Sequence, residues 1–343
     1  MLYVVILFLL ASVYLYCLLG GADFGAGIIE LFARGKSKLH TRALVTRAMA
    51  PIWEANHMWL IITIVILFNA FPPIYTRISI TLYIPLILML LGIILRGTSF
   101  TFRHYDIKTD FSQEVYSKIF EVASFIVSFF LGMLIGAVVS GKIMLHPEGF
   151  WEAYMNPWLN WFSISTGLFV TTIFAFIASV FLIGDSDNEE LRKEFIGKSQ
   201  KATLLMIAAG GLVFVASIIE NVDFAFDFIS NPFSIGLIAA ATVVLPILWM
   251  VIKRGKKWSS RIITGAQLLF IISAFYAVYF PKIVVFKDAE DLTLFNSAAP
   301  DITVSLLAWA LMLGSLLIFP ALIYLLRVFK RLEDKNGWTS TPS

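Results

Sequence analysis

The sequence predicts an all-α, polytopic membrane protein, and three observations carry that prediction. Of its 343 residues, 59% are hydrophobic and only 14% are charged, whereas soluble domains contain roughly a quarter charged residues. Mean hydropathy is strongly positive, at +0.85. The apolar runs are continuous over about 20 residues, which is the length one helix needs to cross a bilayer, and they do not alternate as barrel strands do.

Nine windows of this kind divide the chain, and we treat residues 1–343 as one integral membrane domain. The first apolar run has no basic residues ahead of it and continues to Phe32. We therefore expect a retained first span rather than a cleaved signal peptide. The expected spans are residues 2–33, 48–71, 77–100, 119–140, 160–184, 202–220, 233–252, 262–281 and 302–327.

The connections between these spans alternate in charge. Odd-numbered connections and the C-terminal tail are basic, as in the first connection from Arg34 to Arg47 and the seventh from Lys253 to Arg261. Even-numbered connections are not basic, and the eighth is mainly acidic. By the positive-inside rule, the N-terminus is expected outside and the C-terminus in the cytoplasm, which requires an odd number of spans.

Several classes of function are excluded by this organisation. No connection is long enough to fold into a soluble catalytic domain, and we find no phosphate-binding loop and no feature that suggests a nucleic-acid partner. Cys17 is the single cysteine, so an internal disulfide is excluded. Any chemistry must take place within the bilayer or in a partner protein.

Two acidic residues lie inside apolar spans and are the main candidates for function. Asp23 lies in the first span, about 16 Å along the helix axis from its basic end at Arg34, and Glu54 lies about 10 Å into the second span after Arg47. Ionisable groups within a bilayer are costly and usually face a protein interior or a water path. Both carboxyls suit a proton pathway from the cytoplasm, and the alternative is a pair of structural acids satisfied by helix ends or arginines.

His57 stands three residues after Glu54, on the same face of the expected helix. It suits a proton relay, a quinone contact or a metal ligand, and the alternative is a packed, hydrogen-bonded histidine. Tight metal binding or bis-histidine haem binding needs more ligands than His57 alone, so we expect no metal and no cofactor bound by this chain alone. Asn56 is a further polar residue in the same span.

Arginines and tryptophans near the span ends suggest structural roles. Arg96 and Arg103 close the third span, where they either extend to the interface or neutralise Asp23, Glu54 or a buried group of a partner. Trp53 and Trp59 are typical of an interfacial aromatic belt.

Small residues repeat at four-residue spacing in two spans. Gly21 and Gly25 form such a face in the first span, and Gly132 and Gly136 form one in the fourth. This spacing favours close contact between membrane helices, so we expect a packing role for these glycines and no ligand role.

With these motifs in view, the chain resembles subunit II of the cytochrome bd-type quinol oxidases. The resemblance rests on residues 21–27 (GADFGAG), residues 51–60 (PIWEANHMWL), Arg96 and the ending from Asn296 to Arg331, and it covers essentially the whole chain. Many members have Asp-Gly-Asn where this chain has Glu-Ala-Asn at residues 54–56, and glutamine commonly replaces His57. Some also carry an acid at the position of Thr101, which weakens any argument for a proton path entering there.

The resemblance implies a bacterial cell-membrane complex that oxidises quinol and reduces oxygen to water. Subunit I would hold two b-type haems, one d-type haem and the quinol site, and this chain would hold no haem and no catalytic centre. It would instead scaffold subunit I and help to deliver cytoplasmic protons, with Glu54 the main relay and Asp23 the second. The resemblance also allows a small single-span subunit, bound lipid and a structural quinone.

Two other functional classes are alternatives to a subunit of a quinol oxidase. An autonomous proton-coupled secondary transporter would use Asp23 and Glu54 as coupling sites, but it predicts internal repeats that the sequence does not show. A haem-bearing oxidoreductase that acts alone predicts several intramembrane histidines and is poorly supported.

Overall fold

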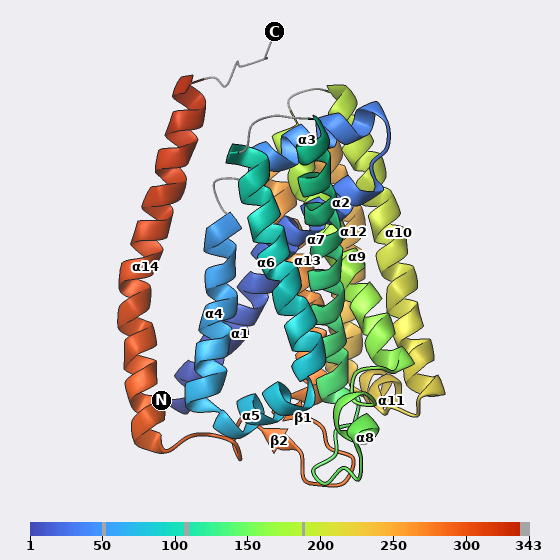
Figure 1. The fold of residues 1–343 in the computed structure, drawn as a ribbon, viewed down its shortest axis with the longest axis vertical. Helices are drawn as coiled ribbons and strands as arrows, with labels where there is room; N and C mark the ends of the chain where they lie inside the picture. The colour runs from blue at the N-terminus through green and yellow to red at the C-terminus, as the bar shows by residue number, and fades with distance from the viewer. Residues whose placement is uncertain (50–52, 106–109, 187–188, 337–343) are drawn as a thin grey trace.

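A computed structural model of the chain describes residues 1–49, 53–105, 110–186 and 189–336, and it is almost entirely helical (Figure 1). Eight of the described helical segments are long and apolar enough to cross a membrane, and nine if a bent pair counts as one span. The prediction of an all-α, polytopic membrane protein is therefore confirmed. Which end faces the cytoplasm stays a prediction.

The secondary structure follows the chain in this order: α1 (Leu2–Leu15), a π-helical segment η1 (Tyr16–Gly20), α2 (Gly21–Phe32), α3 (Lys36–Met49), α4 (Trp53–Ala70), α5 (Pro72–Thr81), α6 (Tyr83–Tyr105), α7 (Asp110–Val139), α8 (Phe150–Tyr154), α9 (Trp161–Asp185), α10 (Glu189–Ile219), α11 (Phe224–Ser230), α12 (Pro232–Lys253), α13 (Lys257–Tyr279), β1 (Lys282–Val284), β2 (Leu292–Thr293) and α14 (Asp301–Asn336).

The predicted end of the second span agrees with α4, which ends at Ala70, but the predicted start at residue 48 falls within α3, and the predicted start of the third span is wrong. The chain turns by 115° between α4 and α5, and α5 lies across the end of the bundle (Figure 1). Phe71 leaves the helical region, with φ −134° and ψ 57°, and Pro72 then begins α5, because proline suits the first position of a helix but not its interior. The third span consequently starts at Tyr83 rather than at residue 77.

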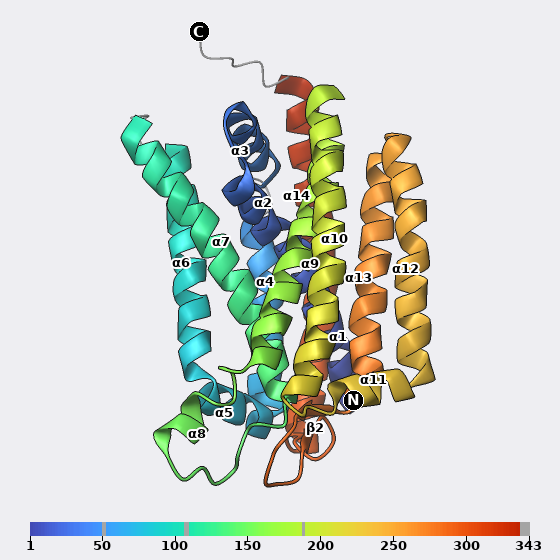
Figure 2. The same ribbon diagram turned by 90° about the vertical axis from the view of Figure 1, so that its right-hand side faces the viewer.

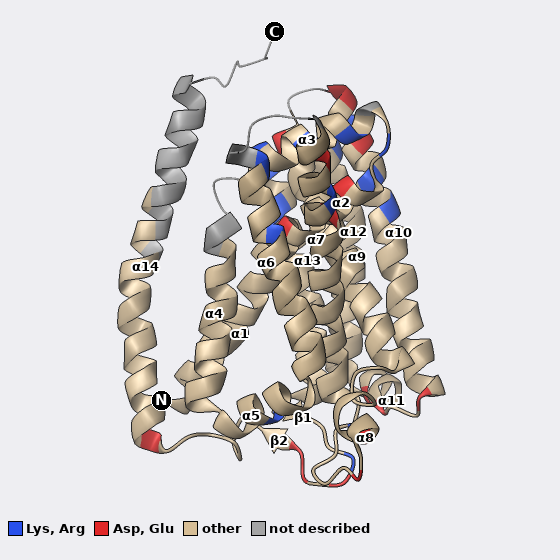
Figure 3. Ribbon diagram, in the orientation of Figure 1, with Lys and Arg blue, Asp and Glu red and all other residues tan. Residues whose placement is uncertain are grey.

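Several helices also extend beyond the predicted apolar windows. α7 and α10 start at Asp110 and Glu189, well before the expected starts at residues 119 and 202, because polar turns continue these helices past the apolar stretch. α3, within the first connection, is a separate helix that lies across the ends of its neighbours (Figure 2). Lysine and arginine gather at this α3 end, which we call the basic end (Figure 3).

α9 forms the centre of the bundle, where it contacts α2, α7, α10 and α13. The glycines of the two small-residue faces lie at its contacts. A Cβ atom added to Gly25 would lie 1.9 Å from the carbonyl oxygen of Phe174, and one added to Gly132 would lie 2.7 Å from that of Thr166. Gly21 and Gly136 are similarly close to α9, at 2.7 Å from the Phe174 ring and 2.9 Å from Ser163 Cα. These glycines allow α2 and α7 to approach α9 closely.

The opposite end of the bundle is closed by a short hairpin of β1 and β2, which the sequence did not predict. Asp288, in its loop, accepts hydrogen bonds from the backbone N–H groups of Leu145 (2.7 Å) and His146 (3.2 Å). The bond from Leu145 is the main reason that the pKa of Asp288 lies below its ordinary value. These bonds tie the hairpin to the connection that follows α7.

Candidate functional site

The deepest charged group of the bundle is an ion pair between α2 and α6. Arg96 Nη2 lies 2.5 Å from Asp23 Oδ1, and the two side chains are 1% and 0% exposed. Arg96 also donates through Nε to Ser124 Oγ on α7 at 3.2 Å. Two buried charges are costly unless they are paired and hydrogen-bonded, and the ion pair and the bond to Ser124 offset part of that cost.

A second ion pair repeats the first, closer to the basic end. Arg103 Nη1 lies 3.0 Å from Glu30 Oε1 and 3.1 Å from Oε2, and its Nη2 donates to Thr46 Oγ1 at 2.7 Å. The two acids are seven residues apart on α2, and the two arginines are seven residues apart on α6. Seven residues are about two helical turns, so two helices that run in the same direction bring both pairs into register.

Phe120 of α7 separates the two arginines. The guanidinium carbon of each one lies 4.8 Å from the centroid of this fully buried ring. An arginine over an aromatic face gains a further electrostatic attraction, which is stronger where water is excluded. α7 therefore holds both arginines in place although it carries neither partner carboxylate.

A third buried acid, Glu121 of α7, lies where α3 covers the basic end. Lys38 Nζ of α3 approaches its Oε1 to 2.7 Å, and Lys118 lies 3.7 Å from its Oε2. Arg42 of α3 connects the acids, since its Nε lies 3.0 Å from Glu30 and its Nη2 lies 3.9 Å from Glu121. We call Asp23, Glu30 and Glu121, with their cations, the acid row.

The acid row begins beside a local change in helix geometry. The first span contains the π-helical turn η1 directly before α2. π-helical turns are rare in proteins overall, and many of those that occur lie at functional sites. Because a π-turn shifts every later side chain around the axis, it sets the face on which Asp23 and Glu30 lie.

Several buried polar atoms of η1, α2, α4 and α6 make no hydrogen bond to the described part of the protein. They are Asp23 Oδ2, Arg96 Nη1, Tyr16 Oη and Asn56 Nδ2. Buried polar groups are normally paired with protein or with ordered water, so these atoms keep unused hydrogen-bonding capacity. At the inner end of the acid row, Asp23 and Arg96 can each therefore take a further hydrogen-bond partner.

The other predicted residues lie around this region in different ways. His57 is partly buried and packs against the Phe24 ring, with centroids 5.9 Å apart. Trp59 belongs to the main hydrophobic core rather than to an exposed belt. The side chains of Glu54 and Trp53 lie outside the described residues, so the prediction for Glu54 stays a prediction.

Glu30 and Glu121 were not predicted from the sequence. Both lie near the ends of apolar spans, where a charged residue ordinarily extends toward water and does not indicate a functional site. The usable signal was the spacing, since Asp23 and Glu30 repeat the interval between Arg96 and Arg103. Among the described residues, no group of three or more His, Cys, Asp or Glu gathers as metal ligands would.

Comparisons with known proteins agree with this architecture. The sequence matches the family model for cytochrome bd terminal oxidase subunit II over residues 1–329. It is 28% identical to cytochrome bd ubiquinol oxidase subunit 2 of Bacillus subtilis, over 94% of each chain. It is also 26% identical to cytochrome bd-I ubiquinol oxidase subunit 2 of Escherichia coli, over 44% of this chain and 41% of that one.

A solved structure shows the same fold. The structure of bd oxidase from Geobacillus thermodenitrificans superposes with a TM-score of 0.76 and 18% identity, covering 95% of this chain and 98% of the other. The likeness covers the whole bundle rather than one part of it.

Proposed function

This chain belongs to the family of cytochrome bd terminal oxidase subunit II, and we propose that it scaffolds a haem-bearing subunit I and helps to deliver cytoplasmic protons to the site of oxygen reduction. Family membership makes it a multi-pass bacterial membrane protein and part of an oxidoreductase complex that contains haem and uses quinol. The proposal concerns the division of labour within that complex.

We assign the haems, two of b type and one of d type, to subunit I, together with the quinol site and the catalytic centre. The donor set of this chain does not fit a haem. His57 lies against Phe24, and it is the only histidine of the sequence within the expected spans, whereas bis-histidine ligation of a haem needs two. No catalytic step is therefore assigned to this chain.

The scaffolding role rests on apolar surface that this chain does not cover itself. Only 11% of the residues in the apolar stretch of α14 are buried, and α6 exposes a row that includes Leu91 and Ile94. The hydrophobic clusters inside the chain leave these residues exposed. They are available to subunit I and to lipid.

The acid row is the observation that carries the proton-delivery role. It contains three buried carboxylates: Glu30 and Glu121 lie beside cations of α3, and Asp23 lies about two helical turns away from Glu30 along α2. Carboxylates that lie in a bilayer usually mark a water or ion pathway. Positive charges of α3, α6 and α7 lie beside Glu30 and Glu121 and neutralise them.

Glu54 is the proposed carrier, with Asp23 and His57 lining the next part of the path. Asp23 Oδ1 is paired with Arg96, and Asp23 Oδ2 has no hydrogen-bond partner among the described groups. Asp23 can therefore accept a hydrogen bond from a further donor through Oδ2 without giving up its ion pair. His57 adds a second polar group against the Phe24 ring. The proposed path thus runs from Glu54 toward Asp23 and His57.

Replacing Glu54 with glutamine tests this role. Quinol-dependent oxygen consumption should fall several-fold in complexes that keep their haem spectrum, because glutamine cannot carry the proton. Glu114→Gln is the matched control, since Glu114 is an exposed acid on α7 near the same end. Unchanged turnover in assembled Glu54→Gln complexes would refute a proton role, and loss of assembly would show that Glu54 is structural.

A further inference from the structure

Glu121 differs from the other two acids of the acid row in the cations that accompany it. Asp23 and Glu30 each have an arginine partner that is itself buried, at 1% and 4% exposed. Among the described cations, Lys38 is the closest to Glu121, at 2.7 Å from Oε1, and its side chain is 29% exposed. Lys118, at 3.7 Å from Oε2, is 62% exposed. Arginine holds a carboxylate in a fixed planar geometry, whereas lysine is a flexible point charge, so the cations of Glu121 are the ones that can turn into water.

The carboxylate of Glu121 also differs in its hydrogen bonds. Its side chain is 0% exposed, and neither Oε1 nor Oε2 makes a hydrogen bond to a described group, although Lys38 lies close enough for an ion pair. By contrast, both oxygens of Glu30 accept hydrogen bonds from Arg103. Both oxygens of Glu121 can therefore accept a donor that approaches from the basic end.

Two further polar side chains of α7 lie between Glu121 and the start of the helix. Gln113 and Ser117 precede Glu121 by eight and four residues, and at about 100° per residue the three lie within about 80° of one another around the helix axis. Gln113 Nε2 and Ser117 Oγ are buried and have no hydrogen-bond partner in the described part of the chain. Buried serines of membrane helices commonly bond back to the preceding turn, as Ser124 does to the carbonyl of Phe120 at 2.7 Å. The Ser117 hydroxyl keeps both its donor and its acceptor capacity.

The same face of α7 leads from Glu121 to the deep ion pair. Ser124 follows three residues later, within the same arc, and its Oγ accepts a hydrogen bond from Arg96 Nε at 3.2 Å. Val115 and Val122, on the opposite face of α7, are exposed, so the helix turns its apolar side outward and its polar side inward. Polar and ionisable residues that face the interior of a membrane protein often mark a water or ion pathway. We call residues 113, 117, 121 and 124 the α7 line.

We propose that Glu121 takes up protons at the basic end and that the α7 line is an entry route of the proton pathway, separate from the one through Glu54 of α4. The inference rests on the proton-delivery role proposed above. A hydronium ion gives one proton to Glu121, so that an O–H bond forms on the carboxylate and a water molecule remains, while Lys38 turns its ammonium group into solvent. Glu121 later releases the same proton toward Asp23, and Lys38 returns to the carboxylate.

The test compares Glu121→Gln with Glu54→Gln in assembled complexes that keep their haem spectrum. Quinol-dependent oxygen consumption should fall several-fold in Glu121→Gln, and Glu121→Asp should retain most of it because it keeps the carboxylate. Glu114→Gln, at an exposed acid of the same helix, should leave it unchanged. If Glu54→Gln slows turnover and Glu121→Gln does not, the α7 route is overturned and the proposed function stands. If neither variant slows turnover, both fail.

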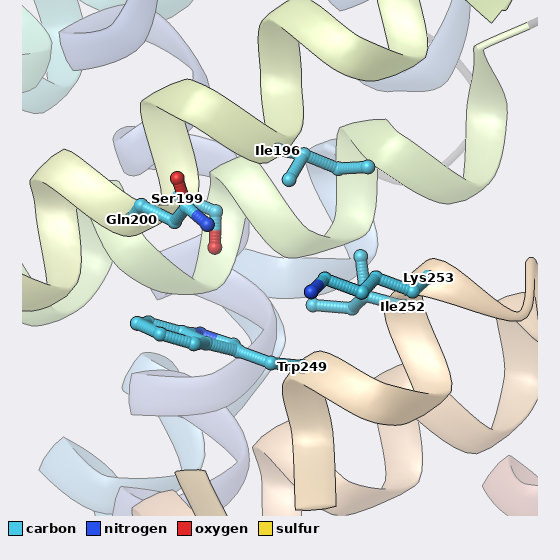
Figure 4. Close-up of a pocket in the computed structure, with 6 residues that line it drawn as sticks. All are labelled: Ile196, Ser199, Gln200, Trp249, Ile252 and Lys253. Atoms are coloured by element: carbon cyan, nitrogen blue, oxygen red, sulfur yellow. The ribbon is translucent and has the colours of Figure 1, made fainter. Parts of the chain in front are cut away.

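Two variants decide the question if Glu121→Gln complexes do not assemble. Lys38→Arg keeps the charge but holds the carboxylate with a planar fork, so it should slow oxygen consumption without lowering the melting temperature. Ser117→Ala should slow it by a smaller factor. Ser199→Ala is the matched control, since that hydroxyl is also buried and unpartnered among described groups but faces the gap between α10 and α12 (Figure 4). Natural turnover in both Lys38→Arg and Ser117→Ala would overturn the route.

Discussion

α9 and α14 are both strongly apolar helices, yet they lie in opposite settings. In the most apolar stretch of α9, 72% of the residues are buried, whereas the corresponding share for α14 is 11%. α9 meets glycines of α2 and α7 that leave room for its backbone, while a Cβ at Gly314 of α14 would contact nothing within 4 Å. Apolarity places a helix in the membrane, and small residues and ion pairs decide which helices pack inside the chain.

The largest effect is expected where α2 meets α9. Gly25→Ala would place a Cβ atom 1.9 Å from the Phe174 carbonyl oxygen, so the helices must separate and the acid row must shift. We expect little assembled complex in the membrane, measured by native gel electrophoresis. Gly211→Ala on α10 is the control, because nothing lies within 4 Å of its Cβ position. Equal amounts of the two variants would contradict this account of the packing.

The next largest effect is expected at the deep ion pair, inside the same core. Arg96→Gln leaves the carboxylate of Asp23 buried without its cation, which typically costs about 3–5 kcal/mol. The melting temperature of the purified complex should fall sharply. Adding Asp23→Asn removes the stranded charge and should restore much of the stability. A double variant as unstable as Arg96→Gln alone would show that the pairing is not what stabilises this region.

A smaller effect is expected on the α14 side of the comparison. Tryptophan is tolerated where a helix faces lipid but prevents close packing against another protein. If α14 contacts subunit I, Leu313→Trp should lower the amount of haem-bearing partner that is retained. Val243→Trp, on an exposed face of α12, should retain it fully. Equal retention in both variants would mean that this part of α14 faces only lipid.

The smallest effect is expected among the outer acids. Arg42→Gln removes one of the two arginines at Glu30, and Arg103 remains in place at 3.0 Å. Because the carboxylate keeps a partner, the loss of stability should be no more than about 1 kcal/mol. Thermal unfolding would measure it beside Arg96→Gln. If Arg42→Gln lost as much stability as Arg96→Gln, the ion pairs at Glu30 and at Asp23 would not differ in the way described here.

Sequence reasoning reached the fold class and the glycine contacts because continuous apolar runs and small-residue spacing act locally. It reached Asp23 because a charge in the middle of an apolar run is conspicuous. It missed Glu30 and Glu121, since their burial depends on α3 covering the end of the bundle. The bend after Phe71 and the π-turn at residues 16–20 were also missed, because both depend on backbone geometry that hydropathy does not report.

The central claim is that this chain is a haem-free subunit that supports a haem-bearing partner. Its most direct test is purification in mild detergent followed by a reduced-minus-oxidised spectrum. The account predicts a second large membrane subunit and bands of b- and d-type haem that leave with that subunit when the two are separated. A colourless, stable assembly of this chain alone, or haem that stays with this chain after separation, would contradict it.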